Sequence, residues 1–308
     1  MARPGRRGVL LLAFGGAASL EEVEPFLRNV LGGRPVSEEM IERAKERYRL
    51  IGGGSPLAAI TGEQAAALQA RLEAGHPGLY RCYWAMRHWK PFIKDTLLRM
   101  VEDSVEEAAA VVMAPHSSRA ATGGYEKDLS AALETTGGSP RTSFVAPWHR
   151  HPLFIRAVAA NLSAALEQLR RARKVRVIFS AHSLPLATIE GDPYVRKLEE
   201  TIADVTAIVD CRWRLAFQSR GAGPRPWLGP SVEEVMEEAA KEGFDAVALV
   251  PLGFTADHVE TLYDIDIHFS GEARRLGLGF ARSASLNASP LFIDALADVV
   301  TSHFEALP

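Results

Sequence analysis

VRVIFSAHSLP (175–185) is the stretch that decides the fold. Apart from Arg176, residues 175–179 are apolar and rich in β-branched side chains, which is typical of a parallel strand buried on both faces. Polar residues begin where this strand is predicted to end, and the first titratable one is His182. Because ligands of open α/β sheets bind at the carboxyl ends of strands, we expect His182 to lie at a ligand site. An imidazole there can take up or release protons near neutral pH.

A second segment, VALVPLGFTADHVETLYDIDIHF (247–269), repeats the pattern of a buried strand followed by titratable side chains. Glu260, Asp264 and His268 are spaced four residues apart, so on an α-helix they share one face. Such a row can pass a proton or hold a hydrated divalent cation, and carboxylates with imidazole suit Fe²⁺ better than Ca²⁺. The titratable side chains of the segment are Asp257, His258, Glu260, Asp264, Asp266 and His268.

Two interpretations of this second segment remain open at this point. One is a solvated helix face, with Asp257 as the N-cap and Glu260 as its capping-box partner. The other is a shared site, because two strand ends that carry titratable groups lie at the same edge of a sheet. In that case we expect His182 and Glu260 to face each other across a slot wide enough for a flat ring.

Predicted strands and helices alternate along the whole chain, which is typical of parallel sheets with right-handed crossovers. The predicted strands are 8–14, 80–86, 108–113, 143–146, 175–179, 214–217, 246–250 and 279–283. The predicted helices are 20–29, 38–50, 61–72, 91–103, 152–170, 192–205, 231–241, 257–270 and 290–303.

We therefore predict an α/β protein with two Rossmann-like, doubly wound domains, each a parallel four-stranded sheet flanked by helices, with a ligand cleft between them. A length of 308 residues favours two domains, because single cores stop growing at about 250–300 residues. The predicted domains are 1–150 and 151–308. The sequence leaves open that the last helix packs on the first domain.

Composition excludes several functional classes. A net charge of −3 and the lack of a Lys/Arg block argue against nucleic acid. Two cysteines, Cys82 and Cys211, cannot supply a four-thiolate iron–sulfur cluster, and they favour a reducing cytosol. The first βα turn, FGGAAS (14–19), lacks the G-x-G-x-x-G pattern of dinucleotide sites. No apolar stretch approaches the ~18–20 residues of a membrane span.

The N-terminus permits two interpretations. A basic start followed by apolar residues 9–14 and small residues is similar to a signal peptide. The same residues suit a first core strand followed by a turn at Gly15 and Gly16. We favour the strand, because the apolar run is short for a signal peptide.

Several segments, in the right order, strongly resemble the ferrochelatase family over nearly the whole chain. They are GGGSPLAAIT (52–61), MRHWKPFI (86–93), APHSS (114–118), FSAHSLP (179–185), GDPY (191–194), FQSR (217–220), PWLGPSVEE (226–234) and PLGFTADHVETLYDID (251–266). The resemblance implies a chelatase that inserts Fe²⁺ into a free-base porphyrin late in haem synthesis.

The resemblance also implies roles for single residues. The family's motif histidine falls on His182 and its motif glutamate on Glu260, which we expect to be catalytic. These two, with Asp264 and His268, are the predicted metal ligands. His268 stands where some members carry a carboxylate, so this chain lacks that negative charge. Phe14 stands where some members that use coproporphyrin carry a tyrosine.

The remaining site predictions concern the porphyrin. A flat apolar ring is expected to lie against aromatic side chains, and its propionates to seek cations, for which Arg28, Arg34 and Arg49 are candidates. His88 is expected to line the cleft or merely to end a strand. The predicted substrate-binding residues are Phe14, Arg34, Ser55, His88, Ser117 and Trp227.

We expect porphyrin and ferrous iron as substrates, no required cofactor and no iron–sulfur cluster. The expected location is the cytoplasm, with peripheral membrane contact left open, and the expected state is a monomer. Transient contact with neighbouring haem-pathway enzymes is also left open, as is the choice between protoporphyrin IX and coproporphyrin III. Alternatives are a non-catalytic tetrapyrrole carrier and a cobalt chelatase on the same fold.

Overall fold

The computed structural model describes residues 6–221 and 225–307 and divides into two compact units. The first unit comprises Met1–Ser117, Thr122–Trp148 and Asn287–Pro308, and the second comprises Ser118–Ala121 and His149–Leu286. Where the sequence divides the chain at residue 150, the main segment of the second unit begins at His149. The C-terminal helix, which the sequence left open, is grouped with the first unit.

The first unit contains one parallel sheet with strand order β2-β1-β3-β4. Residues 9–12 of β1, the second strand in this order, are fully buried, which confirms the predicted core strand. The start of the chain, residues 1–5, lies outside the described residues. The strands are β1 (Arg7–Ala13), β2 (Tyr80–Met86), β3 (Glu107–Val112) and β4 (Arg141–Phe144).

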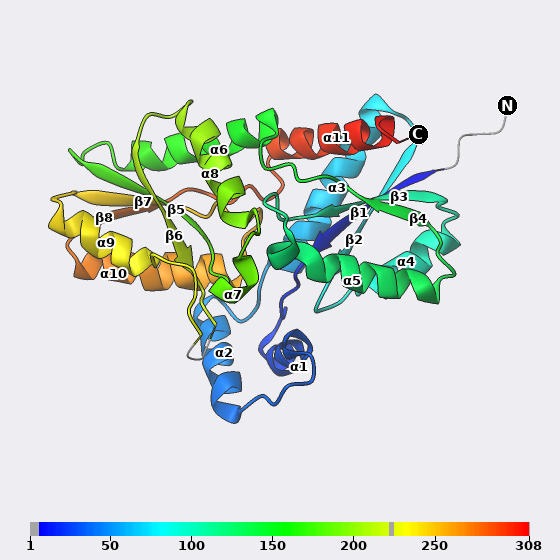
Figure 1. Ribbon diagram of the computed structural model, residues 1–308, viewed down its shortest axis with the longest axis horizontal. Helices are drawn as coiled ribbons and strands as arrows, with labels where there is room; N and C mark the ends of the chain where they lie inside the picture. Colours follow the sequence, from blue (N-terminus) through cyan, green and yellow to red (C-terminus); the bar gives the residue numbers. More distant parts are fainter. Residues whose placement is uncertain (1–5, 222–224, 308) are drawn as a thin grey trace. The chain divides into compact units, whose positions relative to one another are not determined.

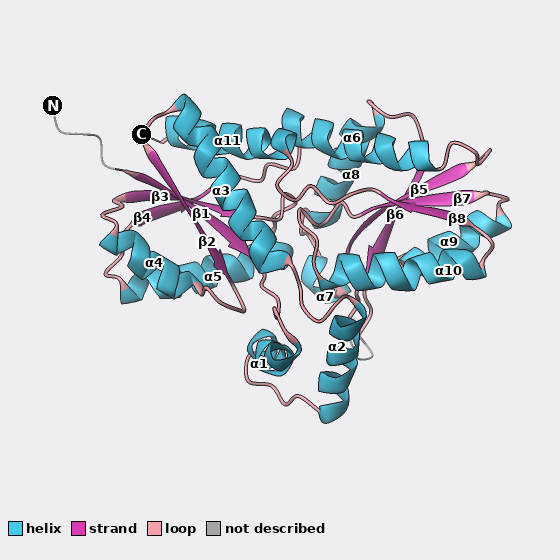
Figure 2. Ribbon diagram, turned by 180° about the vertical axis from the view of Figure 1, so that it is seen from behind, coloured by secondary structure: helices cyan, strands magenta, loops and turns pink. Residues whose placement is uncertain are grey.

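Helices cover both faces of this sheet. Leu10 and Leu12 share a core with α4 (Ile93–Glu102) and α5 (Arg119–Thr135). The opposite face is covered by α3 (Leu57–Gly75) and α11 (Pro290–Glu305), as Figures 1 and 2 show. The helices α1 (Leu20–Leu31) and α2 (Glu38–Leu50) pack against each other.

The second unit repeats the arrangement with strand order β6-β5-β7-β8, again all parallel. One face packs against α9, η1 and α10, and the other against α6 and α8 (Figures 1 and 2). The strands are β5 (Val175–His182), β6 (Arg212–Gln218), β7 (Ala246–Val250) and β8 (Gly279–Arg282). The helices are α6 (Pro152–Gln168), α7 (Leu186–Ile189), α8 (Tyr194–Thr206), α9 (Val232–Lys241), η1 (Glu260–Phe269) and α10 (Ser270–Arg275).

The predicted two-sheet α/β architecture is confirmed, but α5 is a helix that the sequence did not predict. The reason is the pair Gly123-Gly124, which is typical of a turn. In the structure a Cβ on Gly124 would collide with the guanidinium of Arg87. The glycine is thus explained by a close side-chain approach, and the helix continues through it.

Two further differences bear on the site. Strand β5 is longer than predicted and ends on His182, which pairs with Gln218 of β6. The segment predicted as an α-helix over 257–270 is instead a π-helix, η1, followed directly by α10. Single π turns inside helices are rare and are found frequently at functional sites.

Both sheets have their topological switch point, where successive strands change from one side of the first strand to the other, at the equivalent position. The chain moves from β5 to β6 on one side and then to β7 on the other, and it does the same from β1 to β2 and β3. Ligands of open α/β sheets bind at such switch points, beyond the carboxyl ends of the strands. In the second unit this point lies between His182 and the segment that leads from β7 to Glu260. Among the described residues, no helix is both long and apolar enough to cross a bilayer.

Candidate active site

His182 and Glu260 are in direct contact at the switch point of the second unit. The Nδ1 atom of His182 lies 3.2 Å from Oε2 of Glu260. The two side chains are 40% and 26% exposed, so the pair lies at an accessible surface. Behind it, the hydroxyl of Tyr194 donates to the backbone carbonyl of His182 at 3.1 Å.

This contact confirms that the two strand ends meet, but it corrects the expected geometry. A 3.2 Å separation leaves no room for a ring between His182 and Glu260, so they form one hydrogen-bonded dyad instead of two walls of a slot. It also weakens the capping interpretation of Glu260, since its carboxylate is directed at the imidazole. The Asp257 carboxylate itself contacts Arg282, Ser285 and Thr261.

His258 is a second imidazole beside the same carboxylate. Its Nε2 lies 3.9 Å from Oε2 of Glu260. Its Nδ1 lies 3.2 Å from the carbonyl oxygen of Ala256, which can only accept, so Nδ1 carries the proton and Nε2 is turned toward Glu260. The ring packs on Phe254 at 4.6 Å between centroids. The sequence placed His258 among the titratable side chains of its segment but indicated no role for it. Its position two residues before Glu260 could have indicated that it lies beside the same carboxylate.

The charges of the dyad shift both of its pKa values. Burial acts to lower the pKa of His182, but the charge and hydrogen bond of Glu260, with the charge of Asp264, outweigh it, so this pKa is raised above its ordinary value. Burial acts to raise the pKa of Glu260, but the charges and hydrogen bonds of His182 and His258 hold it well below its usual range. The free enzyme therefore favours imidazolium beside carboxylate more than the ordinary imidazole pKa suggests.

Two residues at the end of β6 hold the neighbouring part of η1. Ser219 donates to Oδ2 of Asp264 at 2.6 Å, and its backbone has a φ of 57°, a left-handed conformation that favours glycine. The buried Gln218 donates to the backbone carbonyl of Glu260 at 3.4 Å. The sequence assigned neither residue a role, although both lie in the FQSR segment that carries the family resemblance.

His268, the third residue of the row on η1, lies at the surface. Its Nε2 is 3.0 Å from Oε1 of Glu233 on α9, and the two side chains are 50% and 40% exposed. The row therefore has three separate partners along η1: His182 for Glu260, Ser219 for Asp264, and Glu233 for His268. Within residues 6–221 and 225–307, no three His, Cys, Asp or Glu side chains are gathered as a ready-made metal cage.

The candidate porphyrin-binding residues of the first unit lie around the ends of β1 and β2. Phe14 follows β1, is 44% exposed and packs on His88 at 4.6 Å between ring centroids. Burial and the charge of Arg87 lower the pKa of His88. Ser55 is buried, and its backbone N–H donates to Ala17 at 2.8 Å. Ser117 follows β3, at the switch point of this unit.

Trp227 belongs to the second unit. It forms an isolated bridge with Pro185, three residues beyond His182, and its ring lies under Gly221. Its indole Nε1 is buried and has no hydrogen-bond partner among the described residues. The ring thus flanks the loop that follows β5.

The three candidate arginines for propionate binding are engaged elsewhere. Arg28 pairs with Glu24 one turn away at 2.7 Å. Arg34 donates to the carbonyl of Leu31 at 3.0 Å, and Arg49 pairs with Glu42 and Glu46. Their roles toward a substrate stay predictions.

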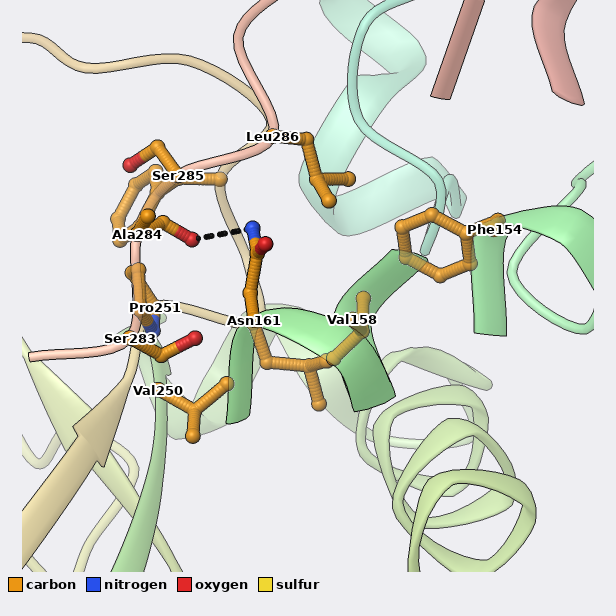
Figure 3. Close-up of a pocket in the computed structure, with 11 residues that line it drawn as sticks. Phe154, Val158, Asn161, Val250, Pro251, Ser283, Ala284, Ser285 and Leu286 are labelled. Carbon is orange, nitrogen blue, oxygen red and sulfur yellow. Dashed lines mark hydrogen bonds between the residues drawn. The ribbon is translucent and has the colours of Figure 1, made fainter. Parts of the chain in front are cut away.

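A separate hollow of about 270 Å³, open mouth included, lies beside α6 in the second unit (Figure 3). Phe154 and Val158 form its apolar side, and Asn161 donates to the carbonyl of Ala284 across it at 2.9 Å. It is lined by no titratable side chain. The side chains that line it therefore offer no acid or base, unlike the dyad.

Comparison with known proteins shows the family of this chain. A profile of the ferrochelatase family matches residues 6–304. The chain belongs to the ferrochelatase family. It is 40% identical to a ferrochelatase of Geotalea uraniireducens, over 96% of this chain and 98% of that protein. It is 38% identical to a ferrochelatase of Deinococcus radiodurans, over 95% and 94% of the two chains. It is 37% identical to a coproporphyrin III ferrochelatase of Halalkalibacterium halodurans, over 95% and 96%.

Solved structures with the same fold are themselves chelatases. SirB from Bacillus subtilis, determined with Fe³⁺, matches with a TM-score of 0.59 at 15% identity, over 96% of this chain and 95% of that one. CbiX, described as the terminal enzyme of sirohaem biosynthesis in denitrifying bacteria, matches with a TM-score of 0.56 at 14% identity, over 98% and 100%. At such identities the likeness shows the fold alone.

Proposed function

We propose that this ferrochelatase inserts Fe²⁺ into a free-base porphyrin at the switch point of its second unit, with His182 and Glu260 as the catalytic pair. The observation that carries the proposal is the 3.2 Å contact between an imidazole on one strand end and a carboxylate reached from the next strand. Both side chains are partly exposed, so a substrate can reach them. A fold alone would not specify this chemistry, which depends on the side chains.

Metal insertion must remove two protons from the pyrrole nitrogens of the porphyrin. His182 accepts them, one at a time, when its ring is neutral. Because the pKa of His182 is raised, a larger share of the free enzyme is protonated at neutral pH than an ordinary pKa near 6.5 gives. Glu260 stabilises the imidazolium that forms, and it also attracts the incoming cation.

The remaining polar groups of η1 extend from the dyad toward solvent. Asp264 supplies a second carboxylate, held by Ser219, and His268 supplies an exposed imidazole paired with Glu233. Carboxylate oxygens and imidazole nitrogens are suitable ligands for Fe²⁺. We propose that iron reaches the dyad along this row, with His268 at its outer end.

The porphyrin itself is expected to contact the aromatic and polar side chains predicted from the sequence. Phe14 is exposed enough to meet an apolar ring. Its lack of a hydroxyl distinguishes it from a tyrosine that could touch the metal. Turnover measured separately on protoporphyrin IX and coproporphyrin III identifies the natural substrate.

We further propose that the enzyme needs no cofactor and no iron–sulfur cluster. Its two cysteines support this, because a cluster held by four thiolates needs twice as many. We propose a monomer in the cytoplasm that contacts the membrane or neighbouring enzymes of haem synthesis only transiently. Sedimentation of the purified chain alone tests whether it is a monomer, and sedimentation with lipid vesicles tests its contact with membranes.

The decisive experiment compares wild type with Glu260→Gln under anaerobic conditions, with free-base porphyrin and Fe²⁺ or Zn²⁺. Glutamine preserves size and hydrogen bonding but removes the charge. We expect the variant to fold and to shift the porphyrin absorption bands on binding, yet to lose most metal insertion. A wild-type protein that binds porphyrin without accelerating metalloporphyrin formation would instead be the non-catalytic carrier.

A further inference from the structure

Arg282, the last residue of β8, bridges two carboxylates that lie on either side of Glu260 and Asp264 in the sequence. Its Nη1 lies 2.7 Å from Oδ1 of Asp257, and its Nε lies 2.7 Å from Oδ1 of Asp266. The side chains of Arg282 and Asp257 are each only 18% exposed, and that of Asp266 is 35% exposed. These contacts therefore lie largely out of water, where a charge pair is screened less than at the surface.

The Asp257 arm of this bridge is reinforced by further donors. Ser285 donates to Oδ1 of Asp257 at 2.7 Å, and Thr261 lies 3.3 Å from the same oxygen. Thr261 in turn accepts from the backbone N–H of His258 at 2.9 Å. Through Oδ1 of Asp257, Arg282 is thus connected to the turn that precedes η1 and to Thr261, the second residue of η1.

In the sequence, the two arms enclose Glu260 and Asp264, the first two residues of the row. Asp257 stands three residues before Glu260, and Asp266 stands two residues after Asp264. Both row residues therefore lie on a segment that is tied at each end to β8, a strand of the sheet that also carries His182. A π-helix has rare backbone geometry, so contacts from outside the helix matter for its shape.

We propose that Arg282 is a positioning residue: it clamps the turn before η1 and the middle of η1 to β8, so that Glu260 stays in contact with His182 and Asp264 with Ser219. Its charge is matched by two carboxylates, so it does not serve as an anion-binding group. This role concerns the placement of the helix, and only its effect on turnover rests on the proposed function.

The test compares Arg282→Lys with a matched control, Arg176→Lys. Lysine keeps the charge but is a single point donor that cannot span two carboxylates as a guanidinium can. Arg176 lies on the same sheet, at the opposite end of β5 from His182. It is 13% exposed and pairs with Glu242 at 2.6 Å. Both substitutions therefore disturb a mostly buried, paired arginine.

Hydrogen exchange of the backbone amides in 260–269 reads out the clamp without requiring activity. We expect Arg282→Lys to speed exchange there by at least ~10-fold relative to α9, because lysine leaves one of the two carboxylates without its partner and so favours local opening of η1. Arg176→Lys is expected to leave the exchange of η1 relative to α9 unchanged. Asp266→Asn removes one arm only and should give a smaller change in the same direction, which keeps the test available if Arg282→Lys does not fold.

Steady-state kinetics supply the second readout. We expect kcat for metal insertion to fall about 10-fold in Arg282→Lys, a loss of about 1.4 kcal/mol in transition-state stabilisation, with KM for porphyrin nearly unchanged. Unchanged exchange of η1 in both Arg282→Lys and Asp266→Asn would overturn the clamp. Faster exchange with unchanged kcat would uphold the clamp and overturn the catalytic role proposed for the dyad.

Discussion

The two switch points of this protein share a topology and differ in chemistry. In the first unit, β1 leads to the aromatic Phe14 and a glycine turn, while β3 leads to His116 and Ser117. In the second unit, the corresponding strands lead to His182 and to Glu260. The sheet order is the same, so the fold supplies a place for a ligand in each unit. In the second unit these strand ends bring an imidazole into contact with a carboxylate.

A histidine follows or ends a strand in each unit, and the pKa values of these two histidines are shifted in opposite directions. His88 follows β2 of the first unit, where burial and the charge of Arg87 lower its pKa. His182 ends β5 of the second unit, where the carboxylates of Glu260 and Asp264 overcome burial and raise its pKa. The neighbours of each imidazole therefore shift its pKa in opposite directions, toward the neutral ring at His88 and toward the charged ring at His182.

The largest expected effect separates these two histidines. We expect His182→Ala to lower the rate of metal insertion by at least ~100-fold, the low end for loss of a general base, while porphyrin binding persists. His88→Ala removes only ring packing on Phe14, and we expect a loss below ~10-fold. Anaerobic turnover and porphyrin fluorescence measure both. Equal losses in the two variants would break the comparison.

The second prediction concerns pH. Because the base must be neutral, kcat/KM should rise with pH through an apparent pKa above about 6.5. In Glu260→Gln, the NMR titration of His182 should move to lower pH, since the main partner that raises its pKa is gone.

The same shifts predict how stability depends on pH. The raised pKa of His182 contributes stability that is present below about pH 6.5 and is lost as pH rises through its folded value. The lowered pKa of Glu260 contributes stability that is present above about pH 4.3 and is lost on acidification. The difference in unfolding free energy between wild type and Glu260→Gln should therefore shrink from pH 6 to pH 9. A constant difference would argue against the charged dyad.

The third prediction compares left-handed backbone in the two units. Ser104, which follows α4, and Ser219, at the site, both have φ of 57°. Ser104→Gly should raise the free energy of unfolding by roughly 0.5–1 kcal/mol without changing turnover, because only glycine adopts this conformation freely. Ser219→Gly relieves the same strain but loses the hydrogen bond to Asp264, so we expect kcat to fall about 10-fold. Chemical denaturation measures the stability of both variants, and steady-state kinetics measures their turnover. A Ser219→Gly variant that is more stable and keeps full turnover would show that the Ser219 hydroxyl has no role in metal insertion.

The smallest expected effect lies at the outer end of the row. His268→Gln breaks an exposed pair with Glu233, and we expect the free energy of unfolding to fall by no more than about 0.5 kcal/mol. Metal insertion should fall less than in Glu260→Gln, because His268 does not touch the dyad. The rate is measured as a function of Fe²⁺ concentration. If His268 binds iron on its way to the dyad, the variant should need more Fe²⁺ to reach half of its maximal rate.

Sequence patterns predicted most of the architecture, because buried parallel strands are short apolar runs between glycine turns. They failed at α5, where Gly123-Gly124 resembles a turn and the compensating contact with Arg87 is distant in sequence. They also failed on the shape of η1, since spacing alone does not distinguish α from π backbone.

For the site, the pattern predicted that His182 and Glu260 would meet, because each follows a buried strand. It could not predict their direct hydrogen bond, nor the second imidazole of His258 beside the same carboxylate. Ser219 and Arg282 were missed for a related reason. Ser219 matters because it contacts a carboxylate oxygen of Asp264, 45 residues away in the chain, and Arg282 because it contacts one of Asp257, 25 residues away. Contacts between residues so far apart in sequence depend on the tertiary packing.

The placement of α11 has a consequence for biosynthesis. Phe292, Leu296 and Val300 of this last helix are fully buried in the first unit, whose strands are all made before residue 145. The second unit draws almost wholly on 149–286, and so its residues have been translated while the first unit still lacks α11. The unit that begins to emerge from the ribosome first is therefore completed second, because it needs residues 290–305.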